Sequence, residues 1–424
     1  MDVRLSYGKT GLIIKCPPKQ TTVIEPTFVN SLPDPKGAIQ NAIRNPIDSK
    51  PLKSLVKLGQ KVGISVCDIT RPIPSKLILP ILLKELKHIP KEDITIFIAT
   101  GTHRANTKDE LVNMLGSEIV DNFKLSNHNA FDNENLVNTG FTENGIPIEL
   151  NKTWIDQDVK ITLGFVEPHF FAGFSGGPKM VAPGLAGFKT IMALHDYQMI
   201  ANENARWGVT IGNPIHNSIR EIATKNPVTF AIDVTLNRNN EITCCYAGNL
   251  FKVHNAAIDV IKRVSMKPLQ EAFDVVVTTN SGYPLDLNMY QSIKGISAAY
   301  QIVKKGGIII CASECSDGIP KHGEYKNILS SASNPKELLK QISNPKHKKH
   351  DQWQAQIQAQ IQSNSRIKFK SDFLSNEQIE TAFMEPISDI SETIQEILKN
   401  LPNTAKLCVL PEGPQTIPYL INKE

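Results

Sequence analysis

The sequence predicts an α/β protein made of two α/β domains with mainly parallel sheets. Short apolar, β-rich runs alternate along the chain with amphipathic stretches of helical period. A polar, proline-containing break near residues 266–272 interrupts this alternation, which then starts afresh. At 424 residues the chain is also too long for one small core. Because strands separated by helices form parallel sheets with helices on both faces, we expect domains at residues 1–267 and 272–424.

In the first domain the apolar runs at 61–68, 93–101 and 159–165 are expected to be buried strands. Helical periods follow the first two of these runs, at 75–89 and from 107. The runs at 228–236 and 241–246 flank an asparagine-rich turn and predict a hairpin. A further helix is expected over 250–264.

In the second domain we expect strands at 274–280, 307–314, 366–373 and 405–412, with helices over 288–305 and 336–342. The low-complexity content is limited to the glutamine-rich run 352–362. Its composition favours a helix with polar faces rather than disorder.

Composition narrows the class of partner. A net charge of +4 is small for this length, so no nucleic-acid or polyanion partner is expected. The longest apolar runs are shorter than a membrane span, and the N-terminus lacks the pattern of a signal peptide. The seven cysteines match neither a disulfide framework nor a zinc ribbon. We therefore expect reduced thiols and a cytoplasmic location, without a membrane partner.

Polar side chains follow two of the predicted strands of the first domain, at the sheet edge where α/β proteins bind ligands. Asp68, Thr70 and Arg71 could hold a ribose and an anionic group, or could form a turn closed by Pro72 with Arg71 paired to an acid. His103 follows the second strand, where it could act as a general acid or base or could be a hydrogen-bonded structural residue.

A glycine-rich segment ends in Lys179, as the phosphate loop of nucleoside triphosphatases ends in a lysine followed by serine or threonine, and so invites comparison with that loop. It fails that comparison because Pro178 precedes the lysine and Met180 replaces the magnesium-binding hydroxyl residue. The glycines instead let Lys179 approach a ligand closely, with His169 before it and His195 after it. The separation of the two histidines matches no zinc motif, so His195 could be a ligand or a core or capping residue.

In the second domain, polar residues follow the strand at 274–280. Tyr290 and Lys294 lie four residues apart and Gln291 and Lys294 three apart, on one helical face. The amide and the amine suit a carboxylate ligand. The alternative is an exposed lysine on an amphipathic helix.

Together these clusters resemble the nickel-dependent lactate racemase family, whose members are nickel-pincer nucleotide 2-hydroxyacid racemases. The resemblance covers nearly the whole chain from about residue 45, and the motifs keep the family's order and spacing. They are DxTRP at 68–72, ATGxHR at 99–104, HFFAGFSGGxK at 169–179, PG…KTIMAxH at 183–195 and GYPLD…YQxxKG at 282–295.

The resemblance implies two α/β domains with the active site in the cleft between them. It also implies a Ni(II)-pyridinium-3,5-bisthiocarboxylate mononucleotide, the nickel-pincer nucleotide. Lys179 matches the lysine that binds this cofactor covalently, and His195 matches the protein ligand to nickel. The segment with Asp68, Thr70 and Arg71 matches the one that binds the mononucleotide.

The activity that the resemblance implies is interconversion of D- and L-lactate by reversible hydride transfer to the cofactor. His103 and His169 match the two catalytic histidines, one for each enantiomer. Separate maturation proteins are implied as partners for cofactor loading, and a small 2-hydroxy acid as substrate. The matching substrate-binding positions are Arg71, Tyr290, Gln291 and Lys294.

Three departures from the family pattern leave the identity of the 2-hydroxy acid open. Ile69 stands where histidine is common, Pro178 replaces a basic residue, and Thr102, beside His103, replaces an aromatic residue. The closest alternative is therefore a racemase or epimerase of another 2-hydroxy acid with the same cofactor. Two further alternatives are a zinc hydrolase that uses the three histidines and a nucleotide- or phosphosugar-binding module.

Overall fold

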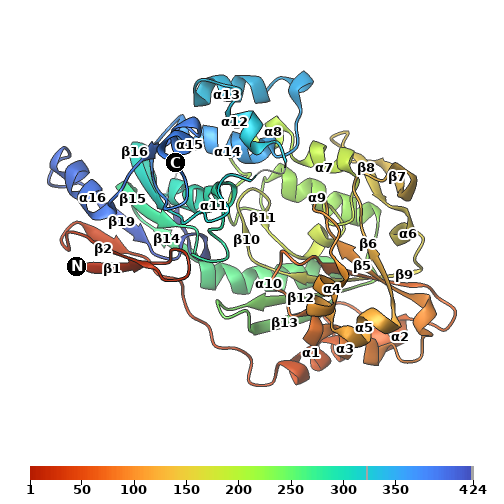
Figure 1. The fold of residues 1–424 in the computed structure, drawn as a ribbon. Coiled ribbons are helices and arrows are strands. Elements are labelled where there is room, and N and C mark those ends of the chain that lie inside the picture. Colours follow the sequence, from red (N-terminus) through yellow and green to blue (C-terminus); the bar gives the residue numbers. More distant parts are fainter. Residues whose placement is uncertain (321–322, 422–424) are drawn as a thin grey trace. The chain divides into compact units, whose positions relative to one another are not determined.

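The chain folds into two compact units, each built on a six-stranded sheet (Figure 1). The computed structural model describes residues 1–320 and 323–421. The central unit is residues 28–264, and the composite unit combines residues 1–27 with 265–424. Both sheets are mainly parallel with helices packed on them, which confirms the predicted α/β class. Within the described residues no helix is both long and apolar enough to cross a bilayer.

The sheet of the central unit has the order β13-β12-β9-β4-β5-β6, and only β13 runs antiparallel to its neighbour. The three buried strands and the hairpin expected from the sequence are therefore confirmed. The strands are β4 (Val62–Cys67), β5 (Ile94–Ala99), β6 (Lys124–Asn127), β9 (Val159–Phe165), β12 (Phe230–Leu236) and β13 (Ile242–Gly248).

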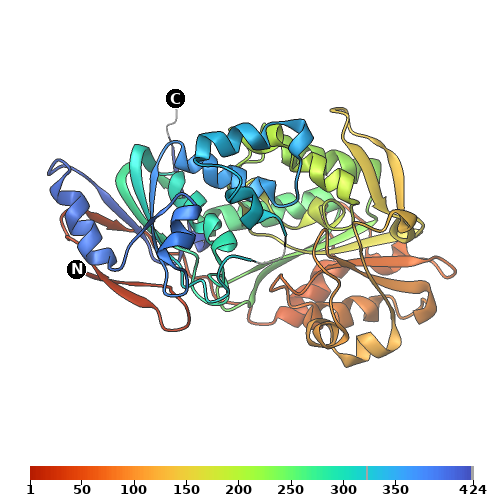
Figure 2. The same ribbon diagram turned by 45° about the horizontal axis from the view of Figure 1, so that its top comes forward.

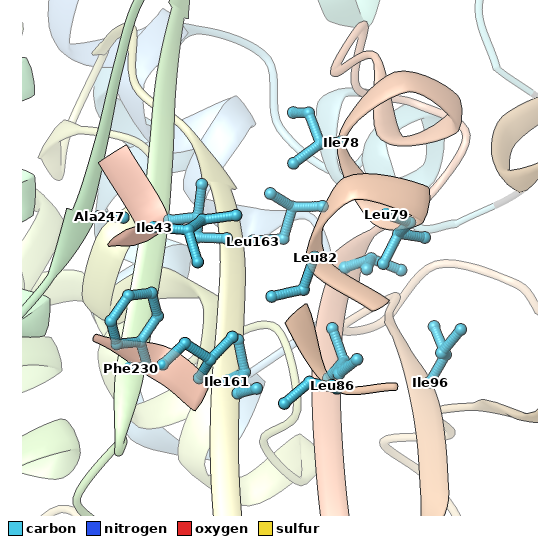
Figure 3. Packing of buried hydrophobic residues seen from close by; sticks show 14 of the residues in the cluster. Ile43, Ile78, Leu79, Leu82, Leu86, Ile96, Ile161, Leu163, Phe230 and Ala247 are labelled. Carbon is cyan, nitrogen blue, oxygen red and sulfur yellow. The ribbon is translucent and has the colours of Figure 1, made fainter. Parts of the chain in front are cut away.

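One face of this sheet is covered by α1 and α3 (Figure 3). Ile43 of α1 and Leu82 of α3 pack with Ile161 and Leu163 of β9. Each such side chain contributes about 1.5–3 kcal/mol when it is removed from water. The helices of the unit are α1 (Pro35–Arg44), α2 (Leu52–Leu55), α3 (Ser75–Glu85), α4 (Lys108–Leu115), α5 (Ser117–Asn122), α6 (Lys152–Ile155), α7 (Phe188–Leu194), α8 (Tyr197–Ala201), α9 (Pro214–Lys225) and α10 (Leu250–Ser265).

The opposite face carries the glycine-rich segment. Its short 3-10 turn η3 (Gly177–Met180) packs across β4, β9 and β12. Phe97 of β5 meets Trp154 of α6 edge to face, with ring centroids 5.5 Å apart. The remaining strands form two antiparallel pairs, β7 (Leu136–Phe141) with β8 (Pro147–Asn151) and β10 (Pro168–His169) with β11 (Gly173–Phe174). The β7–β8 hairpin projects from the unit (Figure 2).

The sheet of the composite unit is wholly parallel, with the order β18-β17-β16-β15-β19-β3. Two smaller sheets accompany it, an antiparallel pair β1-β2 and a parallel pair β14-β20. The strands are β1 (Asp2–Leu5), β2 (Leu12–Lys15), β3 (Thr21–Val23), β14 (Met266–Leu269), β15 (Phe273–Thr279), β16 (Val303–Ala312), β17 (Arg366–Lys370), β18 (Glu385–Pro386), β19 (Leu407–Leu410) and β20 (Ile417–Leu420).

The expected first domain, residues 1–267, is corrected at its start, because residues 1–27 belong to the composite unit. Strand β3 extends the sheet by pairing with β19. The β1–β2 hairpin lies beside α16 (Figure 1), and its Leu5 and Ile14 enter the same core as Val277 and Ile394. This burial of apolar surface attaches the N-terminus to a sheet that the chain completes about 400 residues later.

Two further expectations of the second domain need correction. The helix expected over 288–305 ends at Tyr300, and the chain enters β16 at Val303. The break at 266–272 contains a strand, β14. The helices of the unit are α11 (Met289–Tyr300), α12 (Tyr325–Leu329), α13 (Pro335–Ile342), α14 (Gln352–Gln362), α15 (Asn376–Thr381) and α16 (Ile390–Lys399).

The glutamine-rich run is helical, as expected, but its polar faces are not on the surface. Nearly every residue of α14 is buried, including four glutamines. Gln358 accepts a hydrogen bond from the Tyr325 hydroxyl and donates one to the carbonyl of Ala382 at 2.8 Å. The amide is uncharged and can both donate and accept, so it tolerates burial where a charged side chain would not.

Candidate functional site

The ends of β4 and β5 bring together three of the predicted site residues. These strands are parallel neighbours, with Cys67 opposite Ala99, so the residues that follow them share one edge of the sheet. Nδ1 of His103 lies 2.8 Å from Oδ2 of Asp68. The Thr70 hydroxyl donates to Oδ1 of the same carboxylate at 2.7 Å.

The Asp68 carboxylate determines the tautomer of His103. Burial alone would raise the pKa of Asp68, but hydrogen bonds from His103 and Thr70, with the charge of Arg71, hold it below its ordinary value. An ionised carboxylate can only accept hydrogen bonds, so neutral His103 carries its hydrogen on Nδ1 and a lone pair on Nε2. The imidazole is half exposed while the carboxylate is buried. This arrangement suits a general base.

The backbone forms a turn at this point, because the N–H of Arg71 donates to the carbonyl of Asp68 at 3.1 Å. The expected pairing of the Arg71 side chain with an acid is not found. Among the described residues the guanidinium makes no hydrogen bond and no salt bridge closer than 4 Å. Its five N–H donors could therefore bind a carboxylate or phosphate ligand.

The glycine-rich segment approaches the rest of the unit so closely that two of its positions require glycine. Gly176 and Gly177 have φ angles of 72° and 47°, in the left-handed region. A Cβ at Gly177 would stand 2.4 Å from Cγ of His254. Every residue from Phe170 to Ala182 is buried except Lys179, whose side chain thus leaves a buried segment at a tight turn.

Three predicted residues of this region gather around the ring of Phe171. The ring centroid of Phe171 lies 4.5 Å from that of His169 and 5.1 Å from that of His195. Nζ of Lys179 lies 5.8 Å from the same centroid. Phe171 was not among the predicted site residues, because an aromatic doublet after a histidine is equally typical of a core.

Backbone groups determine which ring nitrogen of His169 and of His195 carries the hydrogen, as inferred from the hydrogen-bond network. His195 follows the last residue of α7, and its Nδ1–H donates to the carbonyl of Ile191 at 2.7 Å, so the lone pair is on Nε2. Metal-binding histidines commonly have this arrangement. Nδ1 of His169 instead accepts from the amides of Phe171 and Ala172, at 3.4 and 3.2 Å, so its neutral ring carries the hydrogen on Nε2.

The described residues contain no group of three or more His, Cys, Asp or Glu side chains that could hold a metal ion. A zinc hydrolase needs at least three protein ligands. His103, His169 and His195 do not form such a group in the part of the chain that the structure describes. A metal that takes one protein ligand and its other ligands from a cofactor remains compatible with His195.

The predicted substrate residues of the composite unit lie in the first turns of α11. The Tyr290 hydroxyl donates to Oδ1 of Asp351 at 3.3 Å, and burial raises the pKa of this phenol. The backbone N–H of Gln291 is capped by Asn288 at 3.1 Å. Lys294 is half-buried, so the alternative of a fully exposed lysine does not hold.

Several buried polar residues behind the glycine-rich segment were also missed. They are Asp233 in β12, His254 in α10 and His216 in α9. Asp233 interrupts an apolar strand and could have been noticed on that ground, whereas the histidines lie on helices of ordinary amphipathic pattern. A cavity of about 550 Å³ between α9 and α10 is lined by His216, Arg220 and Lys262 among others, but by none of the predicted site residues.

Two family models match the chain. The lactate racemase N-terminal domain covers residues 7–208, and the lactate racemase C-terminal domain covers residues 269–417. The chain belongs to the lactate racemase family. The lactate racemase of Thermoanaerobacterium thermosaccharolyticum is 33% identical over 422 residues, which span 98% of this chain and 99% of that protein. The lactate racemase of Lactiplantibacillus plantarum is 37% identical over 390 residues, 91% of each chain.

Solved structures agree with this membership of the lactate racemase family. The apoprotein of the T. thermosaccharolyticum lactate racemase has a TM-score of 0.92 with 33% identity, over 99% of this chain and 100% of that one. A Thermotoga maritima protein, at 19% identity, has a TM-score of 0.67 over 92% of this chain and 99% of its own, and shows the fold alone.

Proposed function

We propose that this protein is a lactate racemase that interconverts D- and L-lactate with a nickel-pincer nucleotide. The observation that carries the proposal is the gathering of Lys179, His169 and His195 around Phe171. These residue types are the ones that the family resemblance pairs with covalent attachment, proton transfer and nickel binding. Family membership and relatives named lactate racemase over nearly the whole chain support it.

The residues present fit the cofactor. Lys179 is the one partly exposed residue of a buried stretch, so its amine can form a bond to a ligand. His195 has its lone pair on Nε2, as a ligand to nickel needs. The Arg71 guanidinium and the Asp68–Thr70 turn would bind the mononucleotide at the sheet edge. When bound, the cofactor supplies a cationic ring that can accept the α-hydrogen of lactate with its electron pair and return it.

The chain's own residues handle the carboxylate and the hydroxyl proton. Arg71, Tyr290, Gln291 and Lys294 are the proposed substrate-binding residues, and the guanidinium, amide and amine among them suit a carboxylate. Nε2 of His103 is an acceptor and takes the hydroxyl proton, and the buried carboxylate of Asp68 stabilises the imidazolium that results. On the other face of the planar 2-oxo acid, His169 presents an N–H at Nε2. One ring takes the hydroxyl proton and becomes an imidazolium, and the other, once it is protonated, returns a proton to the oxygen of the 2-oxo acid. The two rings exchange these roles when the opposite enantiomer reacts.

The deciding experiment uses α-deuterated lactate in ordinary water with freshly matured enzyme. Hydride return keeps the deuterium on the α-carbon of the product, so the opposite enantiomer should form with its label. Extensive washout into solvent would contradict the mechanism, because a base that removes the α-hydrogen as a proton exchanges it with water. Turnover of another 2-hydroxy acid but not lactate would retain the chemistry and overturn the substrate.

Variants then test the two histidines. His103→Ala and His169→Ala should each lower kcat/KM by about a hundredfold or more, in both directions equally, since the equilibrium constant between enantiomers is unity. His88→Ala is a control outside the site, because His88 lies beyond the end of α3 and its ring bonds to the carbonyl of Val56 at 2.9 Å. Wild-type rates in His103→Ala would remove that residue from the mechanism.

The proposal also includes two predictions about the cellular context of the protein. Loading of the cofactor is expected to require separate maturation proteins. A cytoplasmic location is supported by the cysteines, since all seven are free thiols and five of them are buried. Burial raises the pKa of the Cys67 thiol to about 12, so this side chain is packed and unreactive.

A further inference from the structure

Two buried polar side chains hold the turn that carries Lys179. Asp233 of β12 and His254 of α10 are each about 1% exposed, and both lie against Gly177. Neither belongs to a motif of the family resemblance, and neither has a role in the proposed chemistry. Their contacts are with backbone atoms of the glycine-rich segment.

Asp233 supplies the cap that the turn η3 lacks. The residue at its N-terminus, Gly176, has no side chain to accept the first backbone N–H of the turn. Oδ1 of Asp233 accepts this N–H, from Gly177, at 3.0 Å. The N–H of Lys179 closes the same turn on the carbonyl of Gly176 at 3.0 Å, so the carboxylate is one turn away from the lysine backbone.

His254 holds the preceding residue and fills the space beside the glycine. Its Nε2–H donates to the carbonyl of Ser175 at 2.8 Å, which fixes the tautomer because a carbonyl only accepts. The ring packs against Gly177 so closely that a Cβ there would lie within 2.8 Å of three of its atoms. Burial lowers the pKa of His254 to about 3, so the ring is neutral at physiological pH.

Buried polar side chains that hold a turn in this way lower the stability of the core, and close packing alone does not explain why they are there. Among the described residues, Oδ2 of Asp233 and Nδ1 of His254 are buried without a hydrogen-bond partner. Burial also raises the pKa of Asp233 to about 7, against the lowering effect of the Gly177 N–H. Groups of this kind destabilise a core, and apolar side chains would fill the same volume at lower cost. Their presence beside the turn that carries Lys179 points to positioning of that turn.

We propose that Asp233 and His254 are positioning residues for Lys179, which hold the Ser175–Gly177 backbone so that the amine reaches the site shared by His169 and His195. The inference rests on the proposed function only for what Lys179 does there. Neither residue touches the reacting atoms, so each acts through the turn.

The test compares removal of each contact with its conservative replacement. Asp233→Ala removes the acceptor, whereas Asp233→Asn keeps an oxygen for the Gly177 N–H. His254→Ala removes the donor, whereas His254→Gln keeps an N–H for the Ser175 carbonyl. Thr235→Ala is the matched control, since Thr235 lies on the same strand, is buried, and bonds to Thr243 rather than to the turn.

The first readout is the fraction of freshly matured chains that carry a cofactor adduct by intact mass, with Lys179→Ala as the blank. We expect both alanine variants to lower this fraction by about tenfold or more while circular dichroism shows a folded chain. The Asn and Gln variants should restore it, and Thr235→Ala should match wild type. Because the comparison is made among folded chains, a loss of adduct in the alanine variants alone separates positioning of Lys179 from loss of the fold.

The second readout needs no cofactor. Apoprotein is acetylated with an N-hydroxysuccinimidyl ester, and the labelling rate of Lys179 is compared by mass spectrometry with that of the exposed Lys189. The ratio should change in the alanine variants and return in the conservative ones. If the wild type carries no adduct but the alanine variants still change the labelling of Lys179, the covalent attachment is overturned and the positioning role is kept.

If Asp233→Ala has the same adduct fraction and the same labelling ratio as wild type, the proposal is overturned and the proposed function stays intact. If Asp233→Ala does not fold, the pair His254→Ala and His254→Gln decides on the same two readouts. Equal values for that pair would likewise overturn it.

Discussion

The histidines of the candidate site differ in which ring nitrogen carries the hydrogen, and their hydrogen-bond partners determine this. His103 donates from Nδ1 to a carboxylate and His195 from Nδ1 to a carbonyl, so both present a lone pair on Nε2. His169 accepts two amides at Nδ1 and presents an N–H instead. A carboxylate stabilises a protonated ring whereas a carbonyl orients a neutral one. His103 therefore suits proton transfer, and His195 suits metal binding.

A nickel measurement checks this difference. His195→Ala should lose bound nickel and nearly all racemase activity while the chain stays folded. The substitution removes one hydrogen bond at the end of α7, which contributes about 0.5–1.5 kcal/mol, too little to unfold a unit of this size. Nickel is measured by elemental analysis and folding by circular dichroism, with His88→Ala as control. Unchanged nickel stoichiometry in His195→Ala would show that the histidine is only structural.

Asp233 should make the stability of the protein depend on pH. Burial raises its pKa from 3.8 to about 7, so between these values the folded chain binds a proton that the unfolded chain has released. The free energy of unfolding therefore falls as pH rises through this window, by up to about 1.4 kcal/mol per pH unit from this group. Asp233→Asn removes the effect, so its stability relative to wild type should rise with pH and level off above about pH 7. Urea unfolding across that range measures it, and a constant difference would contradict it.

At the scale of elements, α14 shows how an uncharged polar helix can form part of a core. Four of its glutamines are buried, and the carbonyl of Ala382 accepts from both Gln358 and Gln362 at 2.8 Å. The Tyr325 hydroxyl, also fully buried, donates to Gln358. The side-chain amides thus connect α14 to α12 and to the segment after α15. They replace the apolar contacts that a helix in this place would ordinarily make.

The two glutamines Gln358 and Gln360 of α14 should differ in their contribution to stability. Gln358→Ala leaves the buried Tyr325 hydroxyl without its acceptor and should lower the free energy of unfolding by about 1–3 kcal/mol. Gln360, on the same helix but half-buried, is the matched control, and its replacement by alanine should have little effect because alanine favours helix. Chemical denaturation followed by circular dichroism measures both. Equal decreases in the free energy of unfolding would mean that the Tyr325–Gln358 hydrogen bond does not contribute more than an ordinary helix position.

At the scale of the whole molecule, the two ends of the chain form the composite unit and the stretch between them forms the central unit. Residues 1–27 contribute β3 to the edge of the composite sheet and several apolar side chains to its core. The central unit is by contrast one continuous stretch, 28–264. The composite unit therefore needs both ends of the chain for its core.

Removal of residues 1–27 from the full chain tests this division. The composite unit would lose an edge strand and buried residues such as Leu5 and Ile14, each contributing about 1.5–3 kcal/mol. Amide hydrogen exchange should accelerate in β15 and β19, while β4 and β9 keep their protection. Full protection of β19 in the shortened chain, or equal loss in both units, would contradict it.

The sequence by itself determined the elements whose signals are local. Apolar runs of strand length predicted β4, β5 and β9, and their parallel arrangement placed Asp68 and His103 at one sheet edge before any contact was known. Lys179 was notable as the end of a local glycine-rich run, whereas the role expected of His195 came only from its match to the family motifs. Strand periodicity, helical periodicity and the position of a residue after a strand all depend on neighbours within a few positions.

Tertiary structure alone decided the features that depend on residues far apart in the chain. The N-terminal hairpin joins the composite unit because β3 finds β19, a pairing that no local pattern specifies. The burial of α14 depends on Tyr325 and Ala382, outside the helix. The turn at Gly177 depends on Asp233 and His254, which are 56 and 77 residues away in sequence. Hydrophobic burial and buried hydrogen bonds are satisfied in space rather than along the chain, so only the folded molecule shows which partners satisfy them.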